Sequence, residues 1–164
     1  MGKLTTQNIR DLLTNDIKDF LKSMKEKINE NTSTSWREFY DNVDNSNLSS
    51  LEISVMNAAL MSAGINPLLL LNYIPTGFFF SRRDLTEYKI PNNITSIESS
   101  AFDSCRNLQY LYIPKSVQFI ERNVFYGCSE TMIIEYEGNE EDWKGIFISH
   151  DSEIGNKKVV CLNR

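Results

Sequence analysis

Residues 74–136 repeat with a period of 23 positions. Phe79, Phe102 and Phe125 lie one period apart, and Cys105 precedes Cys128 by the same interval. The other matched positions are Leu85 and Leu108; Tyr88, Leu111 and Ile134; Ile90, Ile113 and Tyr136; Pro91 and Pro114; Ile94 and Val117; and Ile97 and Ile120. A fixed period of this length indicates a solenoid, in which each coil buries its apolar side chains against neighbouring coils.

Each copy of the repeat contains a short strand with alternating faces. In residues 110–113 the two aliphatic side chains point to one face and the two tyrosines to the other. Because one short strand cannot bury its inner residues alone, we expect the copies to stack with equivalent residues about 4.8 Å apart. Ile74-Pro75 precedes Ile90-Pro91 by only 16 residues, which predicts a shortened first copy and a solenoid of two and a half turns.

Residues 1–72, before the repeat, show the three- and four-residue spacing of amphipathic helices. Thr34 or Ser35 is the expected N-cap of the second of these helices. The first helix is expected to carry Ile9, Leu12, Leu13, Ile17, Phe20, Leu21, Met24 and Ile28, and the second to carry Trp36, Phe39, Tyr40 and Val43.

Two further helices are expected in the same segment. Ser49 and Glu52 have the spacing of a capping box, because the serine side chain can accept from the Glu52 amide while the Glu52 carboxylate reaches back. The helix that they open is expected to stop at Gly64. Asn66-Pro67 then supplies a cap and a first position for one more short helix through Leu71.

Residues 137–164 are expected to cover the far end of the solenoid. A short helix over 140–145 would place Trp143 on the last coil, and residues 158–161 would add a final strand. The helical segment 1–72 is expected to cover the first coil. Both covers are needed because the terminal coils of a solenoid expose their apolar ends.

The stretch IPNNITSIESSAFDSCRNLQYLYIPKSVQFIERNVFYGCS resembles the BspA-type leucine-rich repeat family, because its Ile-Pro, Phe, Cys and Leu positions follow that family's layout. The segments YEGNEEDWKGI and VVCLNR look like the terminal cap of the same family. The resemblance covers about residues 74–164. It implies a right-handed, β-rich solenoid used for protein contacts.

The predicted fold class is therefore α+β. A small N-terminal helical domain, residues 1–72, is expected to cap a short right-handed leucine-rich-repeat β-solenoid, residues 73–136. Residues 137–164 form the expected C-terminal cap. This division assigns the repeat to the middle of the chain and leaves the helical part without a family resemblance.

Proteins of the family that the repeat resembles occur on bacterial and protozoan surfaces and in phages. This sequence starts without the apolar core of a signal peptide. Its most apolar stretch, residues 65–80, holds two prolines and is shorter than a membrane span of about 20 residues. We therefore expect a cytoplasmic protein, located in the host cytoplasm if phage-encoded, with no membrane partner.

The charge and the cysteines exclude several classes of partner. The formal net charge is −5 and no segment is basic, so a nucleic-acid partner is not expected. Three cysteines without a close pair argue against a disulfide framework and against a zinc site. Reduced, buried thiols are the expectation.

The sequence contains no pattern typical of a catalytic site. His150 is the only histidine, and no nearby residue supplies a nucleophile for it, so we interpret it as an exposed loop residue. The glycines form no phosphate-binding loop, and there is no calcium loop. Cys105 and Cys128 are expected to be buried in the ladder and therefore unreactive. We expect neither an enzyme nor a bound cofactor or metal.

The outward strand positions are the candidate partner-binding residues, because exposed aromatic and aliphatic side chains on a rigid sheet suit an interface. The tyrosines among them have an alternative interpretation, in which they only pair with neighbours along the sheet. Arg82 and Arg83 replace the cysteine turn in the first coil, as a polar contact or, as we favour, a solvated corner. The outward positions are Glu87, Lys89, Tyr110, Tyr112, Ile133 and Glu135.

Taken together, the sequence favours a non-catalytic protein-interaction module. In its sharpest form this hypothesis makes the protein phage-encoded and an inhibitor of a host bacterial protein, such as a defence-system component. One alternative is a self-assembling protein that oligomerises through its helical domain. Another is a fragment of a bacterial surface adhesin built from leucine-rich repeats.

Overall fold

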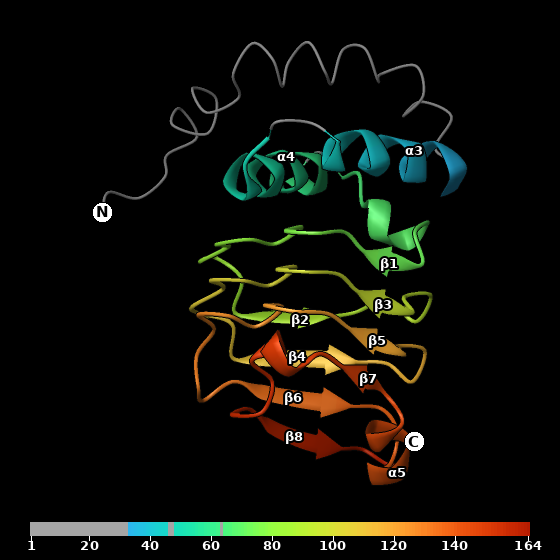
Figure 1. Ribbon diagram of the computed structural model, residues 1–164, viewed down its shortest axis with the longest axis vertical. Helices are drawn as coiled ribbons and strands as arrows, with labels where there is room; N and C mark the ends of the chain where they lie inside the picture. Colours follow the sequence, from blue (N-terminus) through green and yellow to red (C-terminus); the bar gives the residue numbers. More distant parts are fainter. Residues whose placement is uncertain (1–32, 46–47, 63) are drawn as a thin grey trace.

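The computed structural model describes residues 33–45, 48–62 and 64–164. The helix expected over residues 9–28 lies outside these residues. Two helices, α3 (Ser33–Asp44) and α4 (Ser50–Ser62), form a layer at one end of a stack of strands, as Figure 1 shows. A single 3-10 turn, η1 (Pro67–Leu69), connects this layer to the stack.

The ends of the helices confirm most of the expected caps. The Ser49 amide donates to Glu52 Oε2 at 2.8 Å, and the Glu52 amide donates to Ser49 Oγ at 3.3 Å, so the capping box of α4 is formed. The Asn66 side chain caps η1 by accepting from the Leu68 amide at 3.1 Å. The expected cap of α3 at position 34 or 35 is wrong, because α3 already begins at Ser33.

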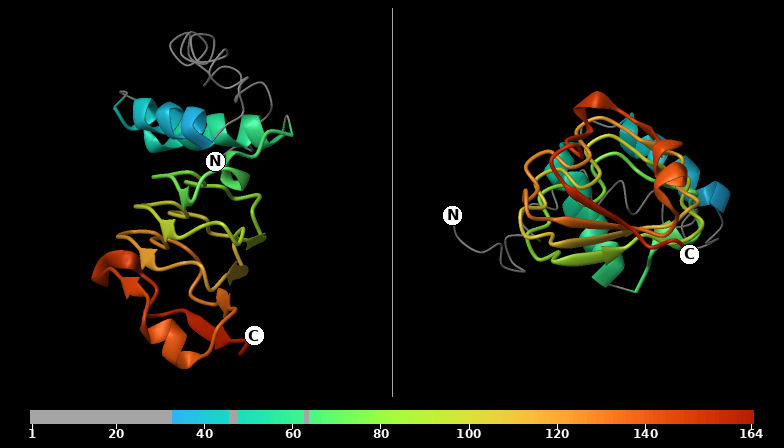
Figure 2. Two further views of the ribbon diagram at one scale, coloured as in Figure 1. Left: turned by 90° about the vertical axis from the view of Figure 1, so that its right-hand side faces the viewer. Right: turned by 90° about the horizontal axis from the view of Figure 1, so that it is seen from below.

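Beyond the helices, the chain coils into two parallel four-stranded sheets. Figure 2 shows the coils following one another around a common axis. The first sheet has the order β1 (Tyr73–Ile74), β3 (Ser96–Ile97), β5 (Phe119–Ile120) and β7 (Phe147–Ile148). The second has the order β2 (Glu87–Lys89), β4 (Tyr110–Ile113), β6 (Ile133–Tyr136) and β8 (Lys158–Cys161).

The solenoid therefore has four coils, each with one strand in each sheet, and the expectation of two and a half turns is wrong. Ile74 pairs with Ile97 in the first sheet, so the first coil is complete. The Ile74-Pro75 pair is not equivalent to Ile90-Pro91. The first coil contributes one inward isoleucine to each of two columns, and each column runs along one sheet. Matching the Ile-Pro pair of one column with that of the other makes the first copy of the repeat look shorter than it is.

The phenylalanines one period apart form a single buried column, as the repeat predicts. The Phe79 and Phe102 rings stack with centroids 5.0 Å apart, and the Phe102 and Phe125 rings with centroids 6.1 Å apart, both at an interplanar angle of 15°. All three side chains are at most 1% exposed. The stacking follows from the parallel register, which places residues 23 positions apart side by side.

The bends between the two sheets use left-handed backbone at positions that also recur every 23 residues. One set is Ser81, Ser104 and Gly127, with φ between 58° and 65°. Glycine adopts this conformation without steric cost, whereas serine does not. A Cβ at Gly127 would also lie 3.3 Å from Ser104 Oγ in the preceding coil. The bend is thus part of the repeat even where the residue type changes.

The two central cysteines belong to the same bend. Cys105 Sγ donates to the Phe79 carbonyl at 3.0 Å, and Cys128 Sγ donates to the Phe102 carbonyl at 3.1 Å. Each thiol thus satisfies a carbonyl of the preceding coil. Burial raises the pKa of Cys105 to about 12 and that of Cys128 to about 11. Since only the thiolate is nucleophilic, neither side chain is suited to catalysis.

Thiol labelling is expected to separate these two cysteines from Cys161, which is only partly buried. With a water-soluble disulfide reagent at neutral pH, Cys105 and Cys128 in the native protein should react at least about a hundredfold more slowly than Cys161. All three should react rapidly in denaturant. Rapid modification of Cys105 or Cys128 in the folded protein, located by peptide mass mapping, would contradict the buried ladder.

Residues after β6 cover the far end of the solenoid. The helix α5 (Glu140–Lys144) is capped by Asn139 and packs Trp143 on Tyr136, with ring centroids 5.2 Å apart. This confirms the expected short helix and the position of Trp143. The strand β7 and the turn η2 (His150–Ser152) were not expected. They form most of a fourth coil, whose Ser152 carbonyl accepts from the Phe125 amide at 3.0 Å.

The helices pack on the first coil through a shared core. Buried residues from Trp36 in α3 to Ile146 near the C-terminus form one continuous apolar cluster. Asn57 of α4 is fully buried, donates to the Phe78 carbonyl at 3.2 Å and accepts from the Tyr40 hydroxyl at 2.6 Å. The helical layer thus covers the first coil.

A partly buried carboxyl, that of Glu98, lies in the solenoid directly after β3. Glu98 Oε2 accepts from Thr76 Oγ1 at 3.3 Å. Burial, and after it the nearby carboxylates of Asp44 and Glu121, raise the pKa of Glu98 to about 7. Between the ordinary pKa of 4.5 and about 7, the folded protein therefore binds more protons than the unfolded chain. Stability should fall as the pH rises through this window.

Glu98→Gln is expected to remove this pH dependence. The substitution should raise the free energy of unfolding by about 1 kcal/mol at pH 8, a value discounted for the partial exposure of the carboxyl. At pH 4 it should change little, because Glu98 is then mostly protonated in both states. Urea unfolding from pH 4 to 8 measures the effect, with exposed Glu87→Gln as the control. Parallel profiles for wild type and Glu98→Gln would refute the raised pKa.

Candidate partner-binding surface

The outer face of the β2–β4–β6–β8 sheet contains all six outward positions expected from the sequence. The register aligns them in two rows across the strands. One row is Glu87, Tyr110, Ile133 and Lys158, and the other is Lys89, Tyr112, Glu135 and Val160. Lys158 and Val160 extend the face beyond the positions that alternation within the repeat identified.

The two tyrosines of this face differ in their surroundings. Lys89 Nζ lies 4.7 Å from the centroid of the Tyr112 ring. The pKa of Tyr112 is raised, first by burial and then by its hydrogen bond to the Glu137 carboxylate. Tyr112 therefore fits the interpretation in which a tyrosine pairs along the sheet. Tyr110, by contrast, is 48% exposed and offers its ring to solvent.

Arg82 is not the solvated corner that we favoured. Its guanidinium forms a two-pronged ion pair with Asp84, with Nε–Oδ1 at 2.8 Å and Nη2–Oδ2 at 2.7 Å. The side chain is only 21% exposed. The hydrogen bond to Asp84 raises the pKa of Arg82. Arg83 is exposed, and its carbonyl accepts from the Asn107 side chain at 2.6 Å. The ion pair replaces the thiol contact of the later coils.

The other sheet carries an exposed aromatic pair that the sequence analysis missed. Phe119 of β5 and Phe147 of β7 are 49% and 65% exposed, and their ring centroids are 6.3 Å apart. Both precede an inward isoleucine, so alternation alone places them outside. They were overlooked because their strands have only two residues each, and because the interval of 28 between them breaks the 23-residue period.

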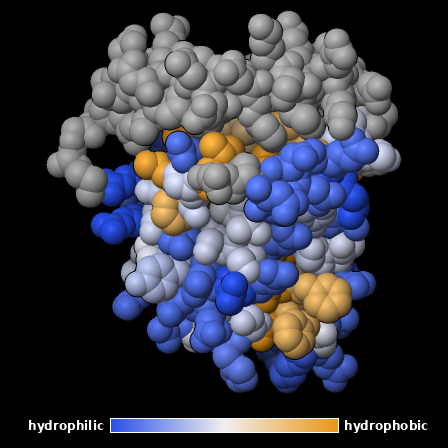
Figure 3. Space-filling view, turned by 45° about the horizontal axis from the view of Figure 1, so that its top comes forward, coloured by the Kyte–Doolittle hydropathy of each residue, from blue (hydrophilic) through white to orange (hydrophobic). Residues whose placement is uncertain are grey.

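Figure 3 shows a surface that is mostly polar, with apolar side chains gathered beside the helical layer and toward the far end of the solenoid. Such groups mark contact sites more often than scattered apolar residues do. Among the residues that the structure describes, the exposed large apolar side chains are Ile65, Leu69, Leu70, Tyr110, Phe119, Tyr126 and Phe147.

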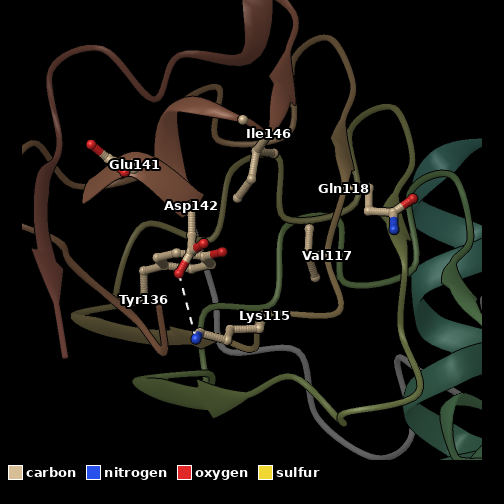
Figure 4. A pocket seen from close by; sticks show the side chains of 8 residues that line it. Lys115, Val117, Gln118, Tyr136, Glu141, Asp142 and Ile146 are labelled. Carbon is tan, nitrogen blue, oxygen red and sulfur yellow. Dashed lines mark ion pairs between the residues drawn. The ribbon is translucent and has the colours of Figure 1, made fainter. Parts of the chain in front are cut away.

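A shallow hollow of about 400 Å³ lies between the start of β5 and the helix α5. Val117 and Ile146 form apolar parts of its lining, and Gln118 and Glu141 lie at its sides (Figure 4). Lys115 Nζ lies 3.4 Å from Asp142 Oδ2, shown by the dashed line. The hollow thus has both apolar and charged residues in its lining.

The described residues, 33–45, 48–62 and 64–164, contain no group of three or more histidine, cysteine or carboxylate side chains placed to hold a metal ion. His150 lies exposed in η2, as expected for a loop residue. Within that part of the chain, no helix is long and apolar enough to cross a membrane.

Comparison with known families agrees with this geometry. Residues 66–132 match a family model described as a BspA type leucine rich repeat region of six copies. The matched segment covers the first two coils and the third coil up to the start of β6, and over this part the chain is similar to that family. Proteins with this type of solenoid generally act through protein contacts. No curated protein and no solved structure matches the chain.

Proposed function

We propose that the protein is a non-catalytic interaction module that binds a partner protein through the outer face of the β2–β4–β6–β8 sheet. Tyr110 carries the proposal. It lies near the middle of the face, 48% exposed, in a row with Glu87, Ile133 and Lys158. An aromatic ring on a rigid sheet contributes contact area at little entropic cost, and flanking charges orient the partner.

The partner that we propose is a cytoplasmic protein of a bacterial host, with this chain encoded by a phage. The chain is small and acidic, and the family that its repeat resembles includes phage proteins. A protein of this kind acts by covering a surface of its target, so inhibition of a defence-system component fits a binding face that lacks a catalytic group.

Affinity capture from bacterial cytoplasm tests this proposal. The tagged wild-type protein is expected to retain one partner at stoichiometric amounts. Tyr110→Ala should weaken retention by about 30-fold, which corresponds to the loss of about 2 kcal/mol at an aromatic hot spot. Tyr126→Ala is the matched control, since Tyr126 is 55% exposed in a bend outside the sheet. Absence of a stoichiometric partner, or equal loss with both variants, would refute the proposal.

Self-association is a second candidate, favoured by apolar side chains around η1. Leu69 is 63% exposed, and its neighbours Leu70 and Ile65 are 38% and 36% exposed. These residues lie at the helical end of the solenoid, where an oligomer interface of the helical domain is expected. Light scattering over a wide concentration range tests this candidate. A molar mass that stays at 18.9 kDa would exclude it.

A further inference from the structure

The outer face of the β1–β3–β5–β7 sheet ends in an aromatic pair that is separate from the proposed face around Tyr110. Phe119 and Phe147 pair directly in the parallel register of β5 and β7. About half of one side chain and almost two thirds of the other are exposed, although their rings are in contact. Adjacent exposed rings on a rigid sheet form a preorganised contact site.

The same row of the sheet contains a third aromatic residue that already has a partner. Tyr73 starts the row and is 8% exposed. The Arg37 guanidinium of α3 lies 5.5 Å from the centroid of its ring. Lys89 covers Tyr112 in the other sheet in the same way. Two outward rings, Tyr73 and Tyr112, are thus covered by cations of the protein itself, whereas no cation from residues 33–45, 48–62 and 64–164 covers the phenylalanine pair.

Carboxylates lie at both ends of the pair. Glu121 follows Phe119 by two positions and is exposed, and its Oε2 accepts from the amide and the hydroxyl of Ser99 at 3.1 and 2.7 Å. At the other end, Gln118 directly precedes Phe119 and lines the hollow together with Glu141 and Asp142 (Figure 4). The Asp142 charge is partly balanced by Lys115, whereas Glu141 lies exposed at the edge. These carboxylates make the surroundings of the rings negative, which favours a cationic partner.

A second copy of the chain does not suit this surface. Its own carboxylates would face those of the first copy, and the net charge of −5 opposes their approach. Two partly exposed rings also offer much less than the roughly 800 Å² per partner of a standard interface. A segment rich in arginine suits it better, because a guanidinium stacks on an aromatic face and pairs with a carboxylate through the same planar group.

We propose that the Phe119–Phe147 pair, together with the hollow beside Gln118 and Glu141, binds an arginine-bearing segment of a partner protein. The segment lies across β5 and β7, with one guanidinium on the rings and a second near Glu141 or Glu121. This site is on a different sheet from Tyr110. It adds a second contact surface to the proposed function, and its test does not depend on the partner of the first.

Nuclear magnetic resonance titration with the peptide acetyl-Gly-Arg-Gly-Arg-Gly-amide tests the site on the full chain. Saturable shifts are expected for the ring signals of Phe119 and Phe147 and for the amides of Gln118 and Ile148. The binding should weaken at high salt, because the carboxylates are exposed. The same peptide with lysine should bind more weakly, since an ammonium does not stack, and the glutamate peptide should not bind.

Two variants assign the shifts to the site. The double variant Phe119→Ser with Phe147→Ser should lower the affinity for the arginine peptide by at least about tenfold, a loss of roughly 1.4 kcal/mol. The double variant Glu121→Gln with Glu141→Gln should reduce the salt dependence of binding. Tyr110→Ser, on the other sheet, should bind as the wild type does. Equal binding of the glutamate peptide, shifts confined to other surfaces, or ring shifts produced by protein concentration alone would overturn the proposal.

Discussion

Replacing Phe102 with alanine is expected to lower the free energy of unfolding by about 3–5 kcal/mol. Phe102 is fully buried and stacks between Phe79 and Phe125, so its removal leaves a cavity that touches three successive coils. The stacked coils limit how far the surrounding residues can close that cavity. Chemical denaturation monitored by circular dichroism measures the loss.

Tyr126→Ala is the control for this substitution, because it removes an exposed ring and should change the free energy of unfolding by no more than about 0.5 kcal/mol. If Phe102→Ala does not fold, Phe102→Leu gives a smaller, measurable loss. If Phe102→Ala lowers the free energy of unfolding no more than the control does, the ring does not lie in the centre of a packed column.

Asn57→Ala is expected to destabilise the protein by about 2–4 kcal/mol. Asn57 joins α4 to Tyr40 in α3 and to the Phe78 carbonyl in the first coil, and it is completely buried. Alanine leaves a hydroxyl and a carbonyl unpaired away from water, each at a cost of about 1–3 kcal/mol. The helical layer should therefore become susceptible to proteolysis before the solenoid does.

A double-mutant cycle with Tyr40→Phe measures how much of the loss belongs to the pair of side chains. The matched control is Asn42→Ala in α3, which removes an exposed amide that donates only to the Glu38 carbonyl within the same helix. Equal stability of the Asn57→Ala and Asn42→Ala variants would show that α4 does not pack on the first coil through this side chain.

The solenoid was predictable because parallel stacking preserves spacing. Residues that lie 23 positions apart in the sequence are direct neighbours in space. Phe102 could therefore be placed between Phe79 and Phe125 without knowledge of the fold. The number of coils was not predictable in the same way. Ile74 and Ile90 look alike in sequence, but Ile74 ends β1 of one sheet and Ile90 directly follows β2 of the other. Only the pairing of β1 with β3 distinguishes them.

The fourth coil was missed for a related reason. The insertion of α5 lengthens the interval before β7, so Phe147 no longer follows Phe119 by one period. The partial burial of Arg82 could not be predicted from the sequence either, since its ion pair with Asp84 depends on the local turn and not on the repeat. The outward positions around Tyr110 followed from alternation, and their role in binding stays a prediction.

The solenoid requires that equivalent residues of successive coils are neighbours in space. The most direct measurement is a nuclear Overhauser experiment in solution on the aromatic rings and the strand amides. We predict contacts from Phe79 to Phe102 and from Phe102 to Phe125, together with contacts across the row Tyr88, Leu111, Ile134 and Val159. Rings without mutual contacts, or strands paired with a different offset, would contradict the solenoid and both proposed binding faces.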